Sequence, residues 1–181
     1  MTILLIATIT ILLGTLYPLI IDALGMGKIS VGAPYFNAVF IPMMIALFVL
    51  MGIGPLIRWK RAKKGDLNKQ LKFILIISVI FGALWPMLFK GEFNIMASVG
   101  MTLACWIVLT VLKDLYNQGI GDNGHWVFSR IPLNHLGMAV AHAGIAISVI
   151  GVTMVSIYEI EMNVKMSPGE QVEISGYQIE Y

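Results

Sequence analysis

Five long apolar runs separated by short polar segments dominate the chain. They cover residues 2–21, 36–57, 71–89, 93–112 and 136–157. Each run is long enough to cross a hydrocarbon layer of about 30 Å, which takes about 20 apolar residues as a helix. Backbone amides inside lipid must be hydrogen-bonded within their own segment, so each run predicts a transmembrane helix. The predicted fold class is therefore an all-α polytopic membrane protein with about five transmembrane helices.

The pattern changes after the last apolar run. Charged or amide side chains alternate with apolar ones over residues 159–166, and this period of two predicts a strand. The SPGE segment at 167–170 predicts a turn, and residues 171–181 predict one or two further short strands. We therefore assign residues 1–157 to a transmembrane region and residues 158–181 to the beginning of a small β-rich extracytoplasmic domain. So few strands are not stable alone, so we expect this domain to be truncated here and to continue in a longer protein.

Composition and charge support a membrane protein and predict its orientation. The chain is 58% hydrophobic and 12% charged, whereas soluble domains are about 45–50% apolar and about 25% charged. Residues 58–72 contain seven lysines and arginines but a single acid, Asp66. The positive-inside rule places this segment in the cytoplasm. Alternation of the spans then puts the N-terminus in the cytoplasm and the acidic C-terminal tail on the outer side.

Two histidines, His135 and His142, lie seven residues apart at the start of the last apolar run. At about 100° per residue they are only about 20° apart around a helix, and His142 lies about 10.5 Å deeper. An imidazole in lipid has a donor and an acceptor to satisfy, and ionisable residues inside membranes indicate functional sites. Two interpretations follow for each ring: a hydrogen bond to a neighbouring helix, or axial ligation of a haem iron.

The opposite side of the same helix carries small residues at spacings of four and three. Small residues let another helix approach closely, so we expect this side to pack tightly and the histidines to face the other way. A single helix cannot supply both axial ligands of one haem, and the other apolar runs contain no histidine. This chain therefore offers half of a haem site, and we expect His125, in a polar loop, to be solvated. The small residues are Gly137, Ala141, Gly144, Ser148 and Gly151.

Other kinds of chemistry lack a pattern in the sequence. No acidic or basic residue lies deep in a predicted span, so we expect no proton or ion relay. There is no Walker motif, no nucleophile elbow and no HExxH motif, and nothing indicates nucleic-acid binding. The single cysteine, Cys105, cannot form an intrachain disulfide. No complete catalytic constellation is present, so whether the chain is part of an enzyme stays open.

Several stretches together resemble the CcmF family of cytochrome c-type biogenesis proteins, the haem lyase subunits of the System I maturation machinery. The resemblance covers nearly the whole chain and matches the C-terminal portion of the family. The related NrfE-type and CycK-type subunits share these features. The stretches are LGTLYPL (13–19), GMGKISVGAPYFNAVFIP (25–42), GIGPLIRWKR (52–61), LGMAVAHAGIAISVIG (136–151) and SPGEQVEISGY (167–177).

The resemblance implies a multi-pass protein of the bacterial or mitochondrial inner membrane. Such a protein works with CcmH-type and CcmI-type subunits, receives haem from the chaperone CcmE and attaches it to apocytochrome c at the outer face. It also implies a haem b held by two transmembrane histidines, of which the second falls on His142, with His135 as the alternative. The first transmembrane histidine and the Trp-rich external segment are absent from this chain.

The sequence therefore leaves two functions open for the chain, and two origins. It is either a component of a haem lyase that supplies one axial ligand, or a non-catalytic membrane scaffold without a cofactor. It is either one product of a split gene or a portion of a longer reading frame. In both cases we expect the chain by itself to be inactive in haem attachment.

Overall fold

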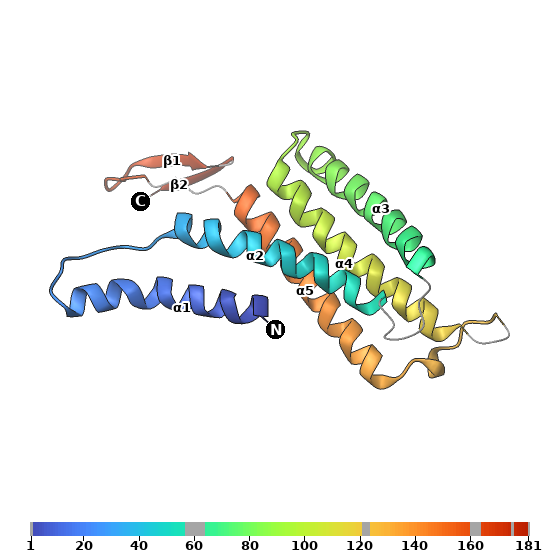
Figure 1. Cartoon of the computed structure of the whole chain (residues 1–181). Helices are drawn as coiled ribbons and strands as arrows, with labels where there is room; N and C mark the ends of the chain where they lie inside the picture. Colours follow the sequence, from blue (N-terminus) through green and yellow to red (C-terminus); the bar gives the residue numbers. More distant parts are fainter. Residues whose placement is uncertain (1, 57–63, 121–123, 160–163, 175, 181) are drawn as a thin grey trace.

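A computed structural model of the chain describes residues 2–56, 64–120, 124–159, 164–174 and 176–180. Five of its helices are long and apolar enough to cross a membrane, and a two-stranded sheet follows them (Figure 1). This confirms the predicted fold class. The elements are α1 (Thr2–Ala23), α2 (Ala33–Ile53), the short 3-10 helix η1 (Gly54–Leu56), α3 (Lys64–Lys90), α4 (Ile95–Gly119), the short 3-10 helix η2 (Phe128–Arg130), α5 (Leu133–Tyr158), β1 (Gln171–Ile174) and β2 (Tyr177–Glu180).

Two helices extend by seven residues beyond one end of their apolar runs. Helix α3 begins at Lys64 instead of residue 71, and α4 continues to Gly119 instead of residue 112. Hydrogen bonding along a helix does not depend on apolar side chains, so both helices extend through polar residues at their ends. At the other end of α4, the Asn94 side chain accepts hydrogen bonds from the amides of Met96 and Ala97, which caps the helix.

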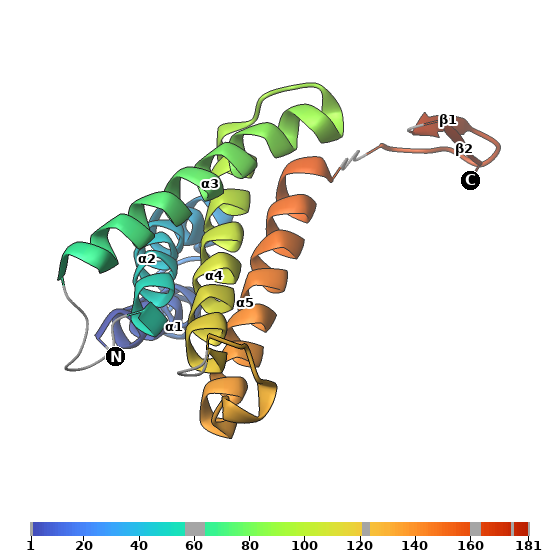
Figure 2. The ribbon, with the colours of Figure 1, turned by 90° about the vertical axis from the view of Figure 1, so that its right-hand side faces the viewer.

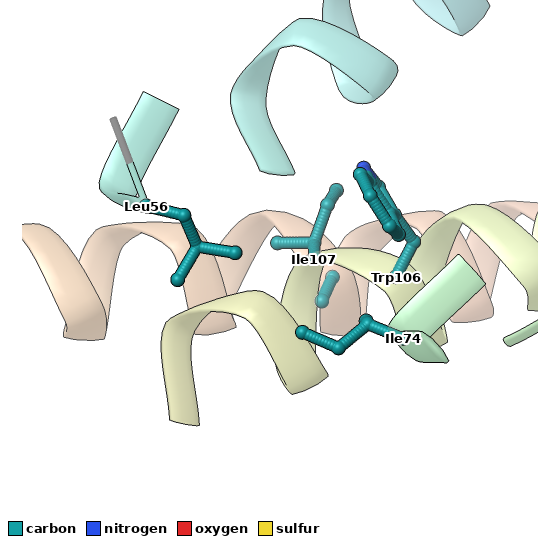
Figure 3. Close-up of a cluster of buried hydrophobic side chains, with 5 residues drawn as sticks. Leu56, Ile74, Trp106 and Ile107 are labelled. Carbon is teal, nitrogen blue, oxygen red and sulfur yellow. The ribbon is translucent and has the colours of Figure 1, made fainter. Parts of the chain in front are cut away.

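Helix α4 is the centre of the bundle. It packs against α2, α3 and α5, whereas α1 packs against α2 (Figures 1 and 2). Accordingly, 44% of the membrane-spanning stretch of α4 is buried, compared with 11% for α5. The core lies where these helices meet, and Figure 3 shows Leu56 of η1 and Ile74 of α3 beside Ile107 of α4. The cluster consists of Leu56, Ile74, Trp106, Ile107 and Ala146.

Glycines set the closest approaches between these helices. A Cβ atom on Gly82 of α3 would lie 2.7 Å from the backbone carbonyl oxygen of Ser98 on α4. A Cβ on Gly100 of α4 would lie 2.7 Å from Cγ2 of Thr153 on α5. Helices that lie in lipid gain little from the hydrophobic effect when they associate. Close packing at small residues stabilises their contact instead. The α3–α4 and α4–α5 pairs are therefore held by close backbone packing.

Helix α2 meets α4 through an indole. The Trp106 Nε1–H group donates to the carbonyl oxygen of Val49 at 3.2 Å. The ring covers Gly52, whose hypothetical Cβ would lie 2.5 Å from Cδ1 of that ring. A tryptophan on α4 thus contacts the α2 backbone directly, because a glycine leaves it room.

The connections alternate between the two ends of the bundle, as expected for successive spans. One end holds the N-terminus, the connection from α2 to α3 and the connection from α4 to α5 (Figure 1). The other end holds the connection from α1 to α2, the connection from α3 to α4 and the β-hairpin. The positive-inside prediction would make the first end cytoplasmic. Four of the seven basic residues that carry this prediction lie outside the described residues, at 57–63.

The C-terminal tail forms one hairpin. The predicted strand over residues 159–166 is wrong for the residues described there: the Glu159 amide caps α5, and residues 164–166 are not in a strand. Alternation alone does not form a strand, because its amides need a partner ladder. The predicted turn is confirmed by the hydrogen bond from the Glu170 amide to the Ser167 carbonyl, and Gly169 takes a φ of 85° there.

The one or two short strands predicted after this turn are present as two. Strands β1 and β2 pair antiparallel, with Val172 opposite Ile179 and Gln171 opposite Glu180. The hairpin stands away from the helices beyond the end of α5 (Figure 2), and Ile179 is 48% exposed. An isolated two-stranded hairpin is at best marginally stable in water, so this piece needs a covering partner.

Candidate functional site

His142 lies in the middle of α5 with its side chain half-buried. Its Nδ1 atom lies 2.9 Å from the carbonyl oxygen of Met138, one turn earlier in the same helix. A carbonyl oxygen can only accept, so Nδ1 carries the proton and donates it. In the neutral ring the lone pair is then on Nε2, and no hydrogen-bond partner of Nε2 is present among the residues that the structure describes. The ring thus has one nitrogen fixed and one able to bind a metal ion.

His135 lies at the first turn of α5 and contacts a polar cluster on α4. Its Nδ1 atom lies 3.3 Å from Oδ2 of Asp114. The Nε2 atom of Gln118 lies 3.4 Å from Oδ1 of Asp114 and 3.4 Å from the His135 Nδ1. The His135 side chain is 33% exposed, whereas that of Asp114 is 3% exposed. We call Asp114, Gln118 and His135 the Asp114 cluster; it joins α4 to α5 at the end that we expect to be cytoplasmic.

The Asp114 cluster lies beyond the apolar run that predicted the fourth span. The apolar run ends at Leu112, which placed Asp114 in a loop, but α4 continues and turns this carboxylate toward α5. The neighbouring Lys113 instead has its Nζ atom 5.1 Å from the ring centroid of Tyr116. If the predicted helix is extended beyond Leu112, Asp114 and Gln118 lie on one face, because they are four residues apart. The sequence could have indicated a polar cluster in this way.

The packing of α5 is the reverse of the expectation. The histidine side faces α4: Ala139 is 5% exposed and Ala146 is 0% exposed on that side. The side with the small residues is exposed, and a Cβ on Gly137, Gly144 or Gly151 would meet nothing within 4 Å in the described part of the chain. Small residues line both sides of α5. Only the histidine side has partners on α4, where Gly100 contacts Thr153 and Asp114 contacts His135. The prediction that both histidines share one face is confirmed by the helix, because α5 is continuous over both positions.

The remaining candidate residues give no second ligand. His125 is exposed, as expected for a solvated loop residue. Within the described ranges, no three histidine, cysteine, aspartate or glutamate side chains group closely enough to hold a metal ion. The donor chemistry of His142 fits one axial position of a haem, because a neutral imidazole with a fixed Nδ1–H is a usual ligand form. A second axial ligand would have to come from another segment or chain.

Comparison with known proteins finds relatives of one kind. The chain is 40% identical to the cytochrome c-type biogenesis protein CcmF of Pseudomonas aeruginosa, over 92% of this chain and 25% of that protein. It is 32% identical to the CcmF protein of Escherichia coli, over 97% of this chain and 26% of that protein. It is 35% identical to the cytochrome c-type biogenesis protein CycK of Rhizobium meliloti, with the same coverage of 97% and 26%.

These matches and the helices define the class as a multi-pass membrane protein related to cytochrome c-type biogenesis proteins. Within this class the chain matches a portion of the CcmF proteins, as the sequence motifs indicate. The chain spans about a quarter of the length of these relatives. No family model matches the chain, and no solved structure matches it.

Proposed function

We propose that the chain is a component of a cytochrome c maturation haem lyase and supplies one axial ligand, His142, to a transmembrane haem b. The observation that carries the proposal is the hydrogen bond from His142 Nδ1 to the Met138 carbonyl. It fixes the tautomer and leaves Nε2 available in a half-buried, apolar part of α5. The names of the relatives, all cytochrome c-type biogenesis proteins, support a role in this pathway.

The residues of this chain would bind and orient the group. A bound haem iron supplies one-electron chemistry, and we propose that this haem keeps the transferred haem reduced. His142 contributes the ligand nitrogen, and the Met138 carbonyl raises its basicity by accepting the Nδ1 proton. The second ligand would come from sequence absent from this chain.

Orientation and partners follow from the same proposal. The end with the hairpin would face the periplasm of a bacterial inner membrane, or the equivalent side of a mitochondrial inner membrane, with the N-terminus on the cytoplasmic side. Its outer connections and hairpin would then lie where haem is attached to apocytochrome c. The proposed partners are CcmH-type and CcmI-type subunits, the haem chaperone CcmE and apocytochrome c, together with membrane lipid.

The test uses the protein purified from its native membranes with its partners retained. We expect the reduced-minus-oxidised optical spectrum to lose its low-spin haem b signal in His142→Ala. His135→Asn is the matched variant, because asparagine can still donate to Asp114 but is not a haem ligand; we expect its spectrum to match the wild type. An unchanged spectrum in His142→Ala would overturn the assignment. Loss of the signal in His135→Asn alone would transfer the ligand to His135.

A scaffold without its own cofactor is the second candidate, and the open side of α5 favours it. Gly137, Gly144 and Gly151 leave room for another helix along this side. A scaffold would position other subunits through such contacts. It predicts that the wild-type protein shows no haem absorbance after purification, while its partner subunits still co-purify. Haem absorbance that depends on His142 would exclude it.

A further inference from the structure

We propose that Asp114 is a positioning residue for the haem ligand: by holding His135, it sets the rotation of α5 and so the direction of His142. This inference rests on the proposed function of His142. It concerns a residue that the sequence pattern placed outside the span and that has no assigned role. Two observations support it: α5 contacts α4 at His135 and Thr153, and the Asp114 carboxylate is buried. A general reason is that metal–ligand bonds tolerate only small displacements of the ligand atom.

The contacts of α5 with α4 lie on one line along the helix. His135 meets Asp114 near one end, and Thr153 meets Gly100 near the other. These two residues of α5 are 18 apart, which is about five full turns, so they share a face. His142 lies between them, about 20° from this line. Any rotation that changes the contacts therefore also turns the His142 ring.

Between its two contact points, α5 packs on α4 through apolar contacts. The most buried residues of α5 there are Ala139 and Ala146, which are 5% and 0% exposed, and Ile145 packs against the same hydrophobic core. Dispersion contacts of this kind have little directional preference. The hydrogen-bonded pair of Asp114 and His135 adds a directional contact to this packing, and we propose that it sets the angle of α5.

The pair is costly to separate. The Asp114 side chain is 3% exposed inside the bundle, and His135 and Gln118 are its hydrogen-bond partners in the described residues. A buried carboxylate that loses its partner carries an uncompensated desolvation cost, which makes the paired arrangement strongly preferred. The angle of α5 is therefore held by the need to keep this carboxylate paired.

A haem ligand needs such control. Side chains lie about 5–6 Å from a helix axis, so a rotation of about 20° moves a side-chain tip by about 2 Å. Metal–ligand distances tolerate deviations of only about 0.2 Å. A small rotation of α5 thus suffices to take Nε2 of His142 out of bonding range. Groups outside the ligand shell that orient a ligand typically change metal affinity by about 10–100-fold.

The test compares two substitutions at one position in the protein purified from its native membranes with its partners. Asp114→Ala removes the acceptor and leaves no buried charge, because His135 is 33% exposed and can be solvated. Asp114→Asn keeps an oxygen that accepts from His135 Nδ1. Lys113→Ala is the matched control on the same turn. The readouts are haem per protein and the g-values of the oxidised low-spin haem, which report the orientation of the axial ligands.

We expect Asp114→Ala to retain about 10-fold less haem, with shifted g-values in what remains, as for other orienting groups. We expect Asp114→Asn and Lys113→Ala to match the wild type in both readouts. If Asp114→Ala also matches the wild type while His142→Ala loses the haem, the positioning role is wrong and the proposed function stands. If His142→Ala keeps its haem, the proposed function fails, and this inference fails with it. Loss of haem in Asp114→Asn with membrane levels unchanged would also contradict a positioning role that needs only an acceptor.

Discussion

Adding one methyl group at Gly100 should separate α4 from α5. In Gly100→Ala the new Cβ would lie 2.7 Å from Cγ2 and 3.0 Å from Cβ of Thr153. Carbon atoms pack best at about 3.5–4.0 Å, so one helix must move by close to 1 Å or Thr153 must leave its position. Overpacking of this kind costs about 1–3 kcal/mol. At about 2 kcal/mol the folding equilibrium constant falls about 30-fold.

The assay is equilibrium unfolding of the purified protein in mixed dodecyl maltoside and SDS micelles, followed by tryptophan fluorescence. Gly144→Ala on α5 is the matched control, because its Cβ meets nothing within 4 Å in the described residues. Alanine favours a helix over glycine, so we expect no loss of stability there. Gly100→Ala should unfold at lower SDS than both the wild type and the control.

A second substitution tests the cause of the loss. Thr153→Ala removes Oγ1 and Cγ2, the two atoms nearest to the new methyl group. The double variant of Gly100→Ala and Thr153→Ala should therefore be nearly as stable as Thr153→Ala alone. Residues in contact show such non-additive effects. If Gly100→Ala is as stable as Gly144→Ala, or if the double variant loses the sum of both effects, the close contact of α4 with α5 is wrong.

Three further results are expected. Gly52→Ala should destabilise the protein in the same assay by about 1–3 kcal/mol, because its Cβ would overlap the Trp106 indole of α4. Gly54→Ala is the control and should be neutral, because its Cβ would have no described atom within 4 Å. Equal effects of the two substitutions would contradict the contact of α2 with α4. In a cysteine-free background, a cysteine at Lys28 should react with a membrane-impermeant maleimide added outside whole cells, and a cysteine at Ser129 should react only after lysis; the reverse pattern would invert the topology. A peptide of residues 164–181 should lack dispersed amide signals in NMR, because an isolated two-stranded hairpin is marginal in water, and a folded spectrum would show that the hairpin needs no partner.

The number and positions of the membrane helices could be predicted because they depend on local hydrophobicity. The contacts between helices could not, since they depend on two matching surfaces. Helix α5 shows this: alanines line its histidine side, and glycines such as Gly144 line the other. The side that packs is the one that matches Gly100 and Asp114 on α4. A pattern within one helix carries no information about that second surface.

The candidate site was predicted in part. The shared face of His135 and His142 follows from their spacing, and the structure confirms it. The hydrogen bond from His142 to the Met138 carbonyl depends on a side-chain rotamer, which spacing does not specify. Asp114 was missed because hydropathy marks where apolar residues end, whereas the helix continues beyond that point. Whether His142 or His135 binds haem stays a prediction.

The exposed glycines of α5 determine how strongly another helix would bind to that side of α5. Lipid chains are as apolar as leucine side chains, so a helix that leaves this side exposes no apolar surface to water. Contact on the glycine side then depends on shape and dispersion, whereas the α4 side is also held by the hydrogen-bonded pair of Asp114 and His135. Helix α5 is thus bound tightly on one side, while a neighbour on the other could be exchanged within the plane of the membrane.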